Sequence, residues 1–461
     1  MKTRKTDIVV IGAGTAGLAA YRALRDAGQR AVVIDHGPLG TLCARAGCMP
    51  SKAALHAARR FADASALARW DRAAREVQRD RLWREVRRLR DHLADGTADS
   101  TRDALGRSLV MGSARFIALD AVEVDGMRIE ARAFVVATGS HPVLPDALAR
   151  YGTSIARGVL TTDTLFSLKR LPATLGLLGL GNIGIEIGLA MARFGVKVVA
   201  VEKNPWPAGI LDPVIAKRAI KTLGREMEMH FGATGHVTRD GSQFRLAIGD
   251  TMHRVERVLA ALGRRPNLAG LALDRAGVTW DESDAPPIDP HTLRLGRTHI
   301  FVAGDASPDR PLQHEAIDEG RIAAANALSV AGDHAPQRPS RRTPLSIVFS
   351  DPDIAQVGMR HDEVHRDRVV VGTGSGDHNG RSKILGDEAN LVRVYADRRD
   401  GTLFGGSLVS TQGEHLAHLL AWAVDQRLTV DRLLAMPFYH PTVEELLQTA
   451  LKDVSRKVVR R

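Results

Sequence analysis

The chain has 461 residues, enough for three domains at ~150 residues each. Its composition is 44% hydrophobic and 25% charged, with 43 Gly and 20 Pro, which excludes a disordered or collagen-like chain. Two Cys are too few for a disulfide-stapled secreted domain. They also lack His neighbours at the spacing of a structural zinc site, so we expect no metal.

The charge balance is a clue to the kind of partner, either a nucleic acid or another acidic molecule. Lys and Arg total 64 against 53 Asp and Glu, a net charge of +11. Aromatic residues make up only 4% of the chain and no nucleic-acid motif occurs, so we expect no nucleic-acid binding. No apolar stretch free of charge reaches the ~20 residues of a membrane helix. An apolar strand begins within a few residues of Met1, so we expect a cytoplasmic protein without a signal peptide.

The first elements in the chain are a strand, a glycine turn, a helix and a second strand. The apolar segment DIVVIGAG leads into a turn with Gly12, Gly14 and Gly17, and the strand AVVID ends at Asp35. Such glycines let the backbone approach a pyrophosphate at a helix N-terminus, while the acidic residue holds ribose hydroxyls. Ordinary turn glycines and a solvated strand end would give the same pattern, so this unit alone leaves both interpretations open.

The same arrangement returns in LGLLGLGNIGIEIGLAMARFGVKVVAVEK. Gly179, Gly181 and Gly184 precede a second helix, and the following strand ends at Glu202. Two such units in one chain are hard to obtain by accident. The sequence therefore predicts two dinucleotide-binding domains of the α/β class.

Two further segments indicate how the chain passes between these domains. The strand ARAFVVATGS closes on Thr138 and Gly139, and ALGRRPN (Ala261–Asn267) is a comparable crossing point. The strand in THIFVAGDAS then places Gly304 and Asp305 before a helix that begins near Leu312. Alternating strand patterns followed by helices predict a separate α+β domain near the C-terminus. The expected boundaries are 1–145 and 265–335 for the first dinucleotide domain, 146–264 for the second and 340–461 for the α+β domain.

Both cysteines lie in GTLCARAGCMPSK, soon after the first dinucleotide unit. The gap between Cys43 and Cys48 allows a disulfide. Pro50 and Ser51 are typical of a helix start, which would put Cys48 beside a helix N-terminus. The partial positive charge there, together with Lys52, would favour the thiolate. Two buried, inert cysteines are the alternative, but the position next to a nucleotide site favours a reversible dithiol.

A histidine near the C-terminus is a candidate general base. His440 precedes Pro441, and Glu445 would fall one turn inside a helix that Pro441 can begin. A carboxylate there can bind one ring nitrogen, fix the tautomer and raise the basicity of the other nitrogen. Thr442 to Glu445 also spells a capping box, so a structural role for Glu445 stays open. A lone surface histidine is the alternative for His440.

These motifs together are similar to those of the pyridine-nucleotide-disulfide oxidoreductases, flavoenzymes of the dihydrolipoamide dehydrogenase and glutathione reductase type. The resemblance extends over almost the whole chain. It implies two Rossmann-like domains, for FAD and NAD, followed by a C-terminal α+β dimerisation domain. The matching motifs, in family order, are GAGTAG, CARAGCMPSK, ATGS, GLGNIGIE, GRRPN, FVAGD and HPTVEE.

The resemblance also implies which residues hold the two cofactors. The first glycine unit would take FAD, and the second would take NAD. For FAD the residues are Gly12, Gly14, Gly17, Asp35, Lys52, Thr138, Gly139 and Asp305. For NAD they are Gly179, Gly181, Gly184 and Glu202.

Catalytic roles follow from the resemblance in the same way. Cys43 would be the thiol that exchanges with substrate sulfur, and Cys48 the thiolate in charge-transfer contact with the flavin. Lys52 would pair with Glu186 near the reactive flavin nitrogen. A helix beginning near Leu312 would point its N-terminus at the flavin carbonyl.

The family forms homodimers through its last domain. His440 and Glu445 would therefore come from the partner subunit of each active site. A single subunit would then lack its base.

Within the family, the residues favour NAD and a lipoyl substrate. Glu202 would bind a ribose 2′-hydroxyl and repel a 2′-phosphate, and Gly184 stands where NADP-using relatives often have Ala; Lys203 argues the other way. No further Cys is present for a thioredoxin or mercuric reductase. A basic surface would suit an acidic lipoyl-bearing carrier protein or domain. The alternatives are an NAD(P)H-dependent reductase of a small disulfide such as glutathione disulfide, or a slowly turning-over flavoprotein redox sensor.

Three departures from the family pattern bear on the substrate. The turn before Cys43 reads GTLC, one residue longer than usual. Asn182 replaces an aromatic residue, and Tyr439 stands where lipoamide-specific members often have Ala and a second His.

Overall fold

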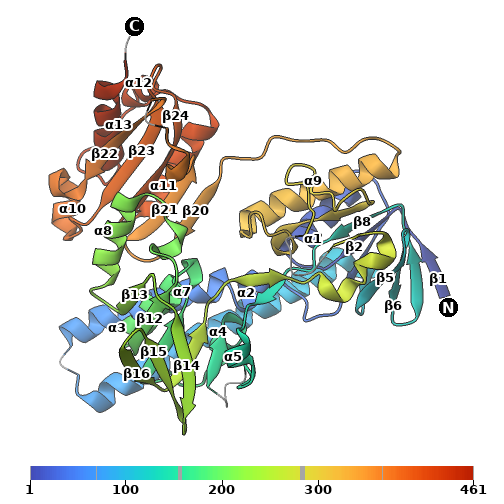
Figure 1. The fold of residues 1–461 in the computed structure, drawn as a ribbon, viewed down its shortest axis with the longest axis horizontal. Coiled ribbons are helices and arrows are strands. Elements are labelled where there is room, and N and C mark those ends of the chain that lie inside the picture. The colour runs from blue at the N-terminus through green and yellow to red at the C-terminus, as the bar shows by residue number, and fades with distance from the viewer. Residues whose placement is uncertain (1, 69, 154–157, 281–285, 366, 460–461) are drawn as a thin grey trace. The chain divides into compact units, whose positions relative to one another are not determined.

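The computed structural model describes residues 2–68, 70–153, 158–280, 286–365 and 367–459 (Figure 1). The chain divides into two compact units, each assembled from separate stretches of sequence. Unit 1 consists of Met1–Pro50, Glu85–Val143 and Gly263–Arg341. Unit 2 consists of Ser51–Arg84, Leu144–Leu262 and Arg342–Arg461.

A five-stranded parallel sheet forms the centre of unit 1. Its order is β19 (Ile300–Val302), β8 (Ala133–Val136), β2 (Ile8–Ile11), β3 (Ala31–Asp35) and β4 (Leu109–Met111). The central strands are continuous apolar runs because both faces of the sheet are covered. Successive side chains alternate between faces, so Val10 joins one core cluster and Val9 joins another.

Two helices cover the first face of this sheet, and a smaller sheet covers the second. Helices α1 (Thr15–Asp26) and α9 (Gln313–Ala331) lie side by side (Figure 1). Their backbones approach so closely that a Cβ on Gly320 would lie 2.3 Å from the Ala16 carbonyl oxygen. The covering sheet has the order β1 (Lys2–Lys5), β7 (Met127–Glu130), β6 (Ala121–Val124) and β5 (Ala114–Ala118).

The two predicted crossing segments lie next to each other. Strand β9 (Ser140–Pro142) pairs antiparallel with β18 (Arg264–Pro266). The excursion of the chain out of unit 1 between Val143 and Gly263 therefore begins and ends at one two-stranded ribbon.

A second five-stranded parallel sheet lies in unit 2. Helix α7 (Asn182–Arg193) packs on it, and α8 (Pro213–Leu223) follows in the same part of the chain. Its order is β10 (Val159–Thr161), β17 (Arg257–Ala260), β11 (Thr174–Leu178), β12 (Lys197–Glu202) and β13 (Glu228–Phe231). An antiparallel sheet packs against it, formed by β14 (Gly235–Asp240), β15 (Gln243–Ile248) and β16 (Thr251–Val255).

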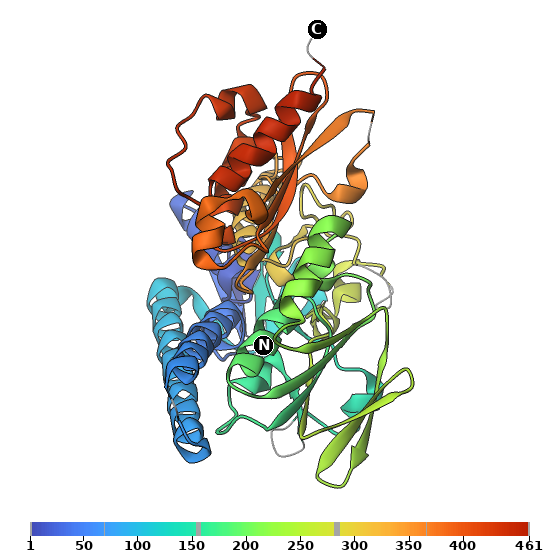
Figure 2. The ribbon, with the colours of Figure 1, turned by 90° about the vertical axis from the view of Figure 1, so that its left-hand side faces the viewer.

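The C-terminal part of unit 2 is an antiparallel sheet with helices on one face, as the sequence predicts. Helices α11 (Gly413–Asp425) and α13 (Glu445–Lys457) share one apolar cluster with the sheet, and Figure 2 shows α13 crossing it. The close approach needs small residues, since a Cβ on Gly372 would lie 2.1 Å from the Ala450 carbonyl oxygen. The strand order is β20 (Leu345–Val348), β21 (Asp353–Gly358), β24 (Leu403–Ser410), β23 (Leu391–Asp397) and β22 (Val369–Ser375).

Other helices complete the chain. Long helices α3 (Cys48–Leu67) and α4 (Arg72–Leu105) follow the cysteine segment, and Trp83 of α4 is fully buried. In the described part of the chain, no helix is both long and apolar enough to span a membrane. The shorter helices are α2 (Leu42–Arg45), α5 (Asp146–Ala149), α6 (Thr162–Leu165), α10 (Gly380–Leu385) and α12 (Val430–Leu434).

A buried charged cluster joins α8 to the C-terminal sheet within unit 2. Asp212 is fully buried and caps α8 by accepting hydrogen bonds from the backbone N–H groups of Val214 and Ile215. Its carboxylate also forms an ion pair with Arg393 and accepts the Tyr395 hydroxyl hydrogen at 2.7 Å. Because a charge without its partner is costly in the interior, these three side chains depend on one another.

We predict that Asp212→Ala lowers the stability of the protein by ~3–5 kcal/mol, because it leaves the Arg393 guanidinium buried without its carboxylate. The midpoint of urea unfolding, followed by circular dichroism, measures the change. Asp240→Ala is the control, since Asp240 pairs with Arg245 and Arg254 at the surface. Equal midpoints for the two variants would contradict the prediction.

Candidate functional site

The first glycine turn links β2 to α1 and can be built only with glycine at two positions. Gly12 has φ +106°, and a Cβ there would lie 2.2 Å from the Ala137 carbonyl oxygen. A Cβ on Gly17 would lie 1.9 Å from the Gly12 carbonyl oxygen, so helix and turn touch backbone to backbone. Gly14 differs, since a Cβ there would meet no atom within 4 Å. Gly14 therefore borders open space at the N-terminus of α1.

Asp35, at the end of β3, ties this turn to the sheet. Its carboxylate accepts hydrogen bonds from the Ala13 N–H at 2.7 Å and from the Gly37 N–H at 2.6 Å. Each carboxylate oxygen keeps lone-pair capacity for a further donor. The carboxylate thus lies beside the glycine turn, where the sequence predicts ribose binding.

The second glycine turn, between β11 and α7, repeats this geometry. Gly179 has φ +96°, and its Cβ would lie 2.3 Å from the Ala261 carbonyl oxygen. A Cβ on Gly184 would lie 2.1 Å from the Gly179 carbonyl oxygen, whereas one on Gly181 would meet nothing within 4 Å. At the end of β12, Glu202 accepts the Leu180 N–H at 2.8 Å.

Both turns fit a dinucleotide. In each, the first and last glycines bring strand and helix together, and the middle glycine leaves space at the first turn of a helix, where the N–H groups lack partners within the helix. In each, a carboxylate at the end of the next strand is bound to the turn.

The crossing ribbon brings three predicted residues of unit 1 together. Thr138 donates its hydroxyl hydrogen to the Asn267 carbonyl oxygen at 2.7 Å, and Gly139 adopts φ +70°. Asp305 accepts the Ser140 hydroxyl hydrogen at 2.9 Å. Asn267 lies in the segment that the sequence marks as a crossing point, but its pairing with Thr138 requires the fold.

A buried glutamate that the sequence did not reveal positions the turn that carries Asp305. Glu319 on α9 accepts the Gly304 N–H at 2.8 Å and pairs with Arg341 at 2.8 Å. Burial raises the pKa of Glu319 overall, against the opposing effect of Arg341. No spacing signal identifies such a residue, because its partners lie far along the chain.

The cysteine pair lies where two helices begin in unit 1. Cys43 is in the short helix α2, which Thr41 caps by accepting the Ala44 N–H. Helix α3 begins at Cys48, two residues before the start predicted at Pro50. Because the helix begins earlier than predicted, Cys48 lies in its first turn, where the helix dipole favours a negative charge.

The two cysteines are reduced, and their side chains are in contact with each other. Hydrogen bonding to Cys48, burial and the negative charge of Cys48 together raise the pKa of the Cys43 thiol. The Cys43 thiol also donates to Gln313 Oε1 at 3.5 Å. Gln313 opens α9, whose start agrees with the helix predicted near Leu312.

The predicted pair of Lys52 and Glu186 is in ion-pair contact within unit 2. Lys52 Nζ lies 2.8 Å from both carboxylate oxygens, and Glu186 is only 2% exposed. The sequence did not reveal two further partners of the Glu186 carboxylate. The Ser51 hydroxyl donates to the same carboxylate at 2.8 Å, and the Phe349 N–H donates at 3.2 Å.

His440 and Glu445 form the predicted histidine and carboxylate pair in unit 2. His440 Nδ1 lies 3.0 Å from Glu445 Oε1, and the ring is largely exposed. Burial raises the pKa of Glu445, but hydrogen bonds from Thr442 N–H and His440 outweigh it and lower the pKa overall. The ring is thus oriented by a carboxylate that stays ionised.

The helix start near His440 was predicted wrongly. Helix α13 begins at Glu445 rather than at Pro441, so Glu445 is its first residue. Only half of the capping box forms: the Thr442 N–H donates to Glu445, while the Thr442 hydroxyl donates to the Tyr439 carbonyl oxygen. Glu445 therefore supports both the turn and the ring of His440.

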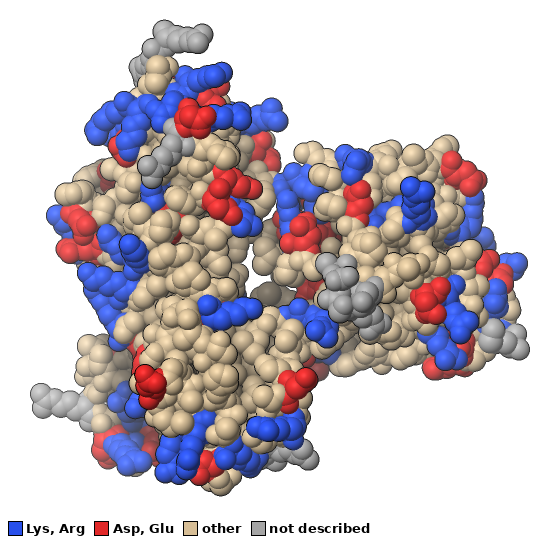
Figure 3. Space-filling view, in the orientation of Figure 1, with Lys and Arg blue, Asp and Glu red and all other residues tan. Residues whose placement is uncertain are grey.

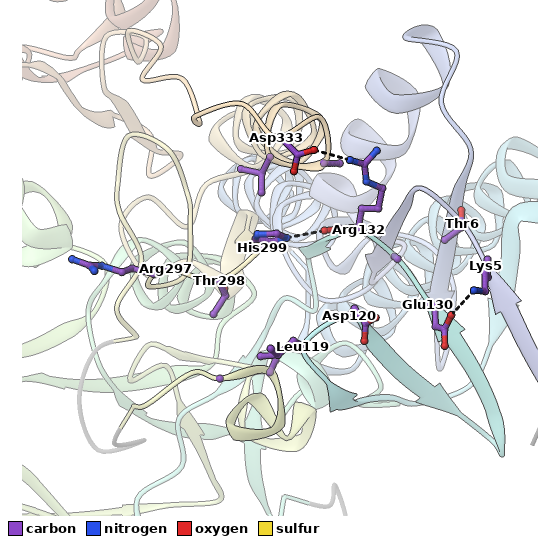
Figure 4. A pocket seen from close by; sticks show the side chains of 15 residues that line it. Lys5, Thr6, Leu119, Asp120, Glu130, Arg132, Arg297, Thr298, His299 and Asp333 are labelled. Carbon is purple, nitrogen blue, oxygen red and sulfur yellow. Dashed lines mark hydrogen bonds and ion pairs between the residues drawn. The ribbon is translucent and has the colours of Figure 1, made fainter.

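A separate pocket of about 650 Å³ lies in unit 1 (Figure 4). Its lining includes Thr6, Arg132 and His299, which come just before the first residues of β2, β8 and β19 in the sequence. It therefore lies at the amino ends of the strands, opposite to the edge that carries the first glycine turn. None of the predicted site residues lines it. The pairs of Lys5 with Glu130 and Arg132 with Asp333 border it.

Family models match most of the chain. Residues 6–320 match the model described as pyridine nucleotide-disulphide oxidoreductase. Residues 345–451 match the model of the dimerisation domain of the same family.

Similar proteins cover the chain almost from end to end. A dihydrolipoyl dehydrogenase of Thermus scotoductus is 28% identical, and the match covers 98% of each chain. Dihydrolipoyl dehydrogenase 3 of Haloarcula marismortui is 27% identical over 100% of this chain and 98% of its own.

Solved structures share the fold. A Cu(II) complex of the HOCl-induced flavoprotein disulfide reductase RclA from Escherichia coli has a TM-score of 0.82 at 22% identity, covering 97% of this chain and 99% of that one. LpdA from Mycobacterium tuberculosis has a TM-score of 0.80 at 24% identity, with the same coverage. With two glycine turns, a thiol pair and matching family models, this chain belongs to the pyridine nucleotide-disulphide oxidoreductase family.

Proposed function

We propose that this protein is an FAD-dependent dihydrolipoamide dehydrogenase, which oxidises protein-bound dihydrolipoyl groups and passes the electrons to NAD. The observation that carries the proposal is the contact between Cys43 and Cys48 in the unit that holds the first glycine turn. The dihydrolipoyl dehydrogenases that match nearly the whole chain support the lipoyl substrate.

The first glycine turn, with Asp35, would hold the adenylate half of FAD, and Thr138, Gly139 and Asp305 would bind its remainder. When bound, FAD supplies a two-electron carrier between the dithiol and the nicotinamide. Lys52, held by Glu186, would place a positive charge at the ring of the cofactor. The dipole of α9 would favour negative charge at the same ring.

The second glycine turn would hold NAD. Gly181 leaves the space for the pyrophosphate, and the N-terminus of α7 faces it. Glu202 favours NAD over NADP, since a carboxylate accepts from a ribose hydroxyl and repels a 2′-phosphate.

The dithiol chemistry proceeds by exchange at two sulfur atoms. In the oxidised protein Cys43 and Cys48 form a disulfide. One thiolate of the dihydrolipoyl group attacks Cys43 Sγ, which forms a mixed disulfide and releases Cys48 as a thiolate. The second substrate thiolate then attacks the substrate sulfur bound to Cys43, which closes the lipoyl disulfide, breaks the mixed disulfide and releases Cys43 as a thiolate. The electron pair of the substrate now resides in the two enzyme thiols.

His440 would remove the protons of the attacking thiols. Glu445 holds Nδ1, which leaves Nε2 free to accept a proton. We propose that His440 acts on Cys43 of the partner subunit, so that each active site needs two chains. The match to a dimerisation domain supports the homodimer.

The positive net charge of the protein suits binding of an acidic carrier protein that bears the lipoyl group. The net charge is +11, and on the face shown in Figure 3 Lys and Arg are interspersed with Asp and Glu. An acidic lipoyl domain would be attracted by the excess of positive charge. We propose that the protein works in the cytoplasm with such a carrier.

Steady-state kinetics with two substrate pairs test the proposed activity. We expect rapid NAD reduction by dihydrolipoamide and little oxidation of NADPH by glutathione disulfide. The reverse preference would support a reductase of small disulfides. Slow turnover with both pairs would support a redox sensor.

We predict that Cys43→Ser and Cys48→Ser each reduce dihydrolipoamide oxidation more than ~10³-fold, since neither variant can form the disulfide. The two variants should differ in colour. Cys43→Ser keeps the thiolate that contacts the flavin and its charge-transfer absorbance, while Cys48→Ser loses it. Wild-type turnover in either variant would refute the assignment, and both should retain FAD.

We predict that His440→Gln lowers dihydrolipoamide oxidation ~10²–10⁴-fold by removing the base. Electron transfer from NADH to an artificial dye should stay close to wild type, because it needs no thiol deprotonation. His334→Gln, at an exposed position after α9, is the control. An equal loss of both activities in His440→Gln would exclude the base role.

We predict that Gly14→Ala releases FAD and that Gly181→Ala raises the KM for NAD ~10-fold or more without loss of FAD. Both residues have backbone angles open to alanine, and the new methyl group would enter the space kept for the pyrophosphate. Gly270→Ala, whose methyl group also meets no atom within 4 Å, is the control. Full FAD content in Gly14→Ala would place the cofactor elsewhere.

A further inference from the structure

Three side chains outside the proposed active site converge in unit 2. Glu228 and His230 belong to β13, and His253 belongs to β16. His230 Nε2 lies 3.0 Å from Glu228 Oε1, and His253 Nε2 lies 3.6 Å from the same oxygen. One ligand atom from each residue lies within 4.8 Å of the other two.

The strands dictate this arrangement. Residues two apart on a strand project from the same face, so Glu228 and His230 point together. His253 reaches them from the antiparallel sheet that packs against the parallel one. The two imidazole rings are 5.7 Å apart and inclined at 60°, so they are not stacked on each other.

The spacing matches that of metal ligands. Two atoms bound to a tetrahedral Zn²⁺ at ~2.0–2.1 Å lie roughly 3.3 Å from each other. The two measured separations, 3.0 and 3.6 Å, lie on either side of that value. Since one ligand atom of each residue also lies within 4.8 Å of the other two, rotations of the side chains would bring all three onto one ion.

A buried nitrogen without a hydrogen bond is the second observation. Among the described residues, His253 Nε2 is buried and has no hydrogen-bond partner, since 3.6 Å to Glu228 is too long for one. A buried polar atom left without a partner is costly. A bound cation would satisfy it and would also take up the negative charge of Glu228.

We propose that Glu228, His230 and His253 form a site for a divalent transition-metal ion of the Zn²⁺ class. Two imidazoles and one carboxylate suit such an ion and not Mg²⁺, which prefers oxygen ligands. Three protein ligands leave a fourth position for water or another ligand, and the exposed Glu228 keeps the site open to solvent.

The ion would join two sheets of the nucleotide-binding part of unit 2. His230 pairs with Val201 in the register of β12 and β13, next to the pair of Glu202 and Phe231. A metal bridge to His253 would fix β16 to this edge strand. The ion should therefore raise the melting temperature of the protein.

The FAD-loaded Cys43→Ser/Cys48→Ser protein is the material for the test, because the thiol pair would itself bind Zn²⁺. Isothermal titration with ZnCl₂ should show one ion per chain, and the melting temperature should rise with Zn²⁺ but not with MgCl₂. Adding His253→Gln or His230→Gln should abolish both effects. His236→Gln, an exposed histidine on β14, should leave them unchanged.

Glu228→Gln keeps the shape of the side chain and should weaken Zn²⁺ binding ~10-fold or more through the lost charge. Circular dichroism and FAD content show whether each variant is folded. Undiminished Zn²⁺ binding in folded His253→Gln, or no uptake of Zn²⁺ by the parent protein, would overturn the proposal. Neither result would bear on dithiol oxidation, which is measured separately.

Discussion

The contact between the Cys43 and Cys48 side chains is the interaction on which the proposed chemistry depends. A short helix and the start of a long one bring the two sulfur atoms together, although four residues separate them. The contact makes the two thiols unequal, because ionisation of one raises the pKa of the other. Two thiols in contact can open and close a disulfide without moving the backbone far.

The glycine turns show one physical solution used twice. In each unit a strand must turn into a helix with backbone contact, and a Cβ at the first or third glycine would overlap a carbonyl oxygen. The middle glycine has no such packing reason, since a Cβ there would meet nothing. The packing glycines thus belong to the fold, and we propose that the middle ones serve the ligand, a distinction that the sequence pattern alone does not make.

Much of the site could be predicted from local sequence, and the misses have physical causes. The glycine turns and the pairing of His440 with Glu445 depend on neighbours close in the chain, so spacing was sufficient. The start of α13 was misjudged because Pro441 permits a helix without requiring one. Ser51 hydrogen-bonds to Glu186, 135 residues away, and no local signal reports such a contact.

The three ligands of the proposed metal site illustrate the same limit. Glu228 and His230 are two residues apart, but His253 joins them only through the packing of one sheet on another. The ion pair of Lys52 and Glu186 joins residues that are distant in the sequence, as the contact with His253 does. Unlike that contact, it was predicted, but only through the family resemblance.

A count of thiols in the purified, FAD-loaded protein tests the central claim most directly. After unfolding without reductant, the oxidised protein should show no free thiol. After anaerobic treatment with one equivalent of dihydrolipoamide, removal of the small molecule by desalting and then unfolding, it should show two per chain, the full cysteine content of the sequence. Two free thiols before treatment, with no change after it, would contradict a redox-active disulfide.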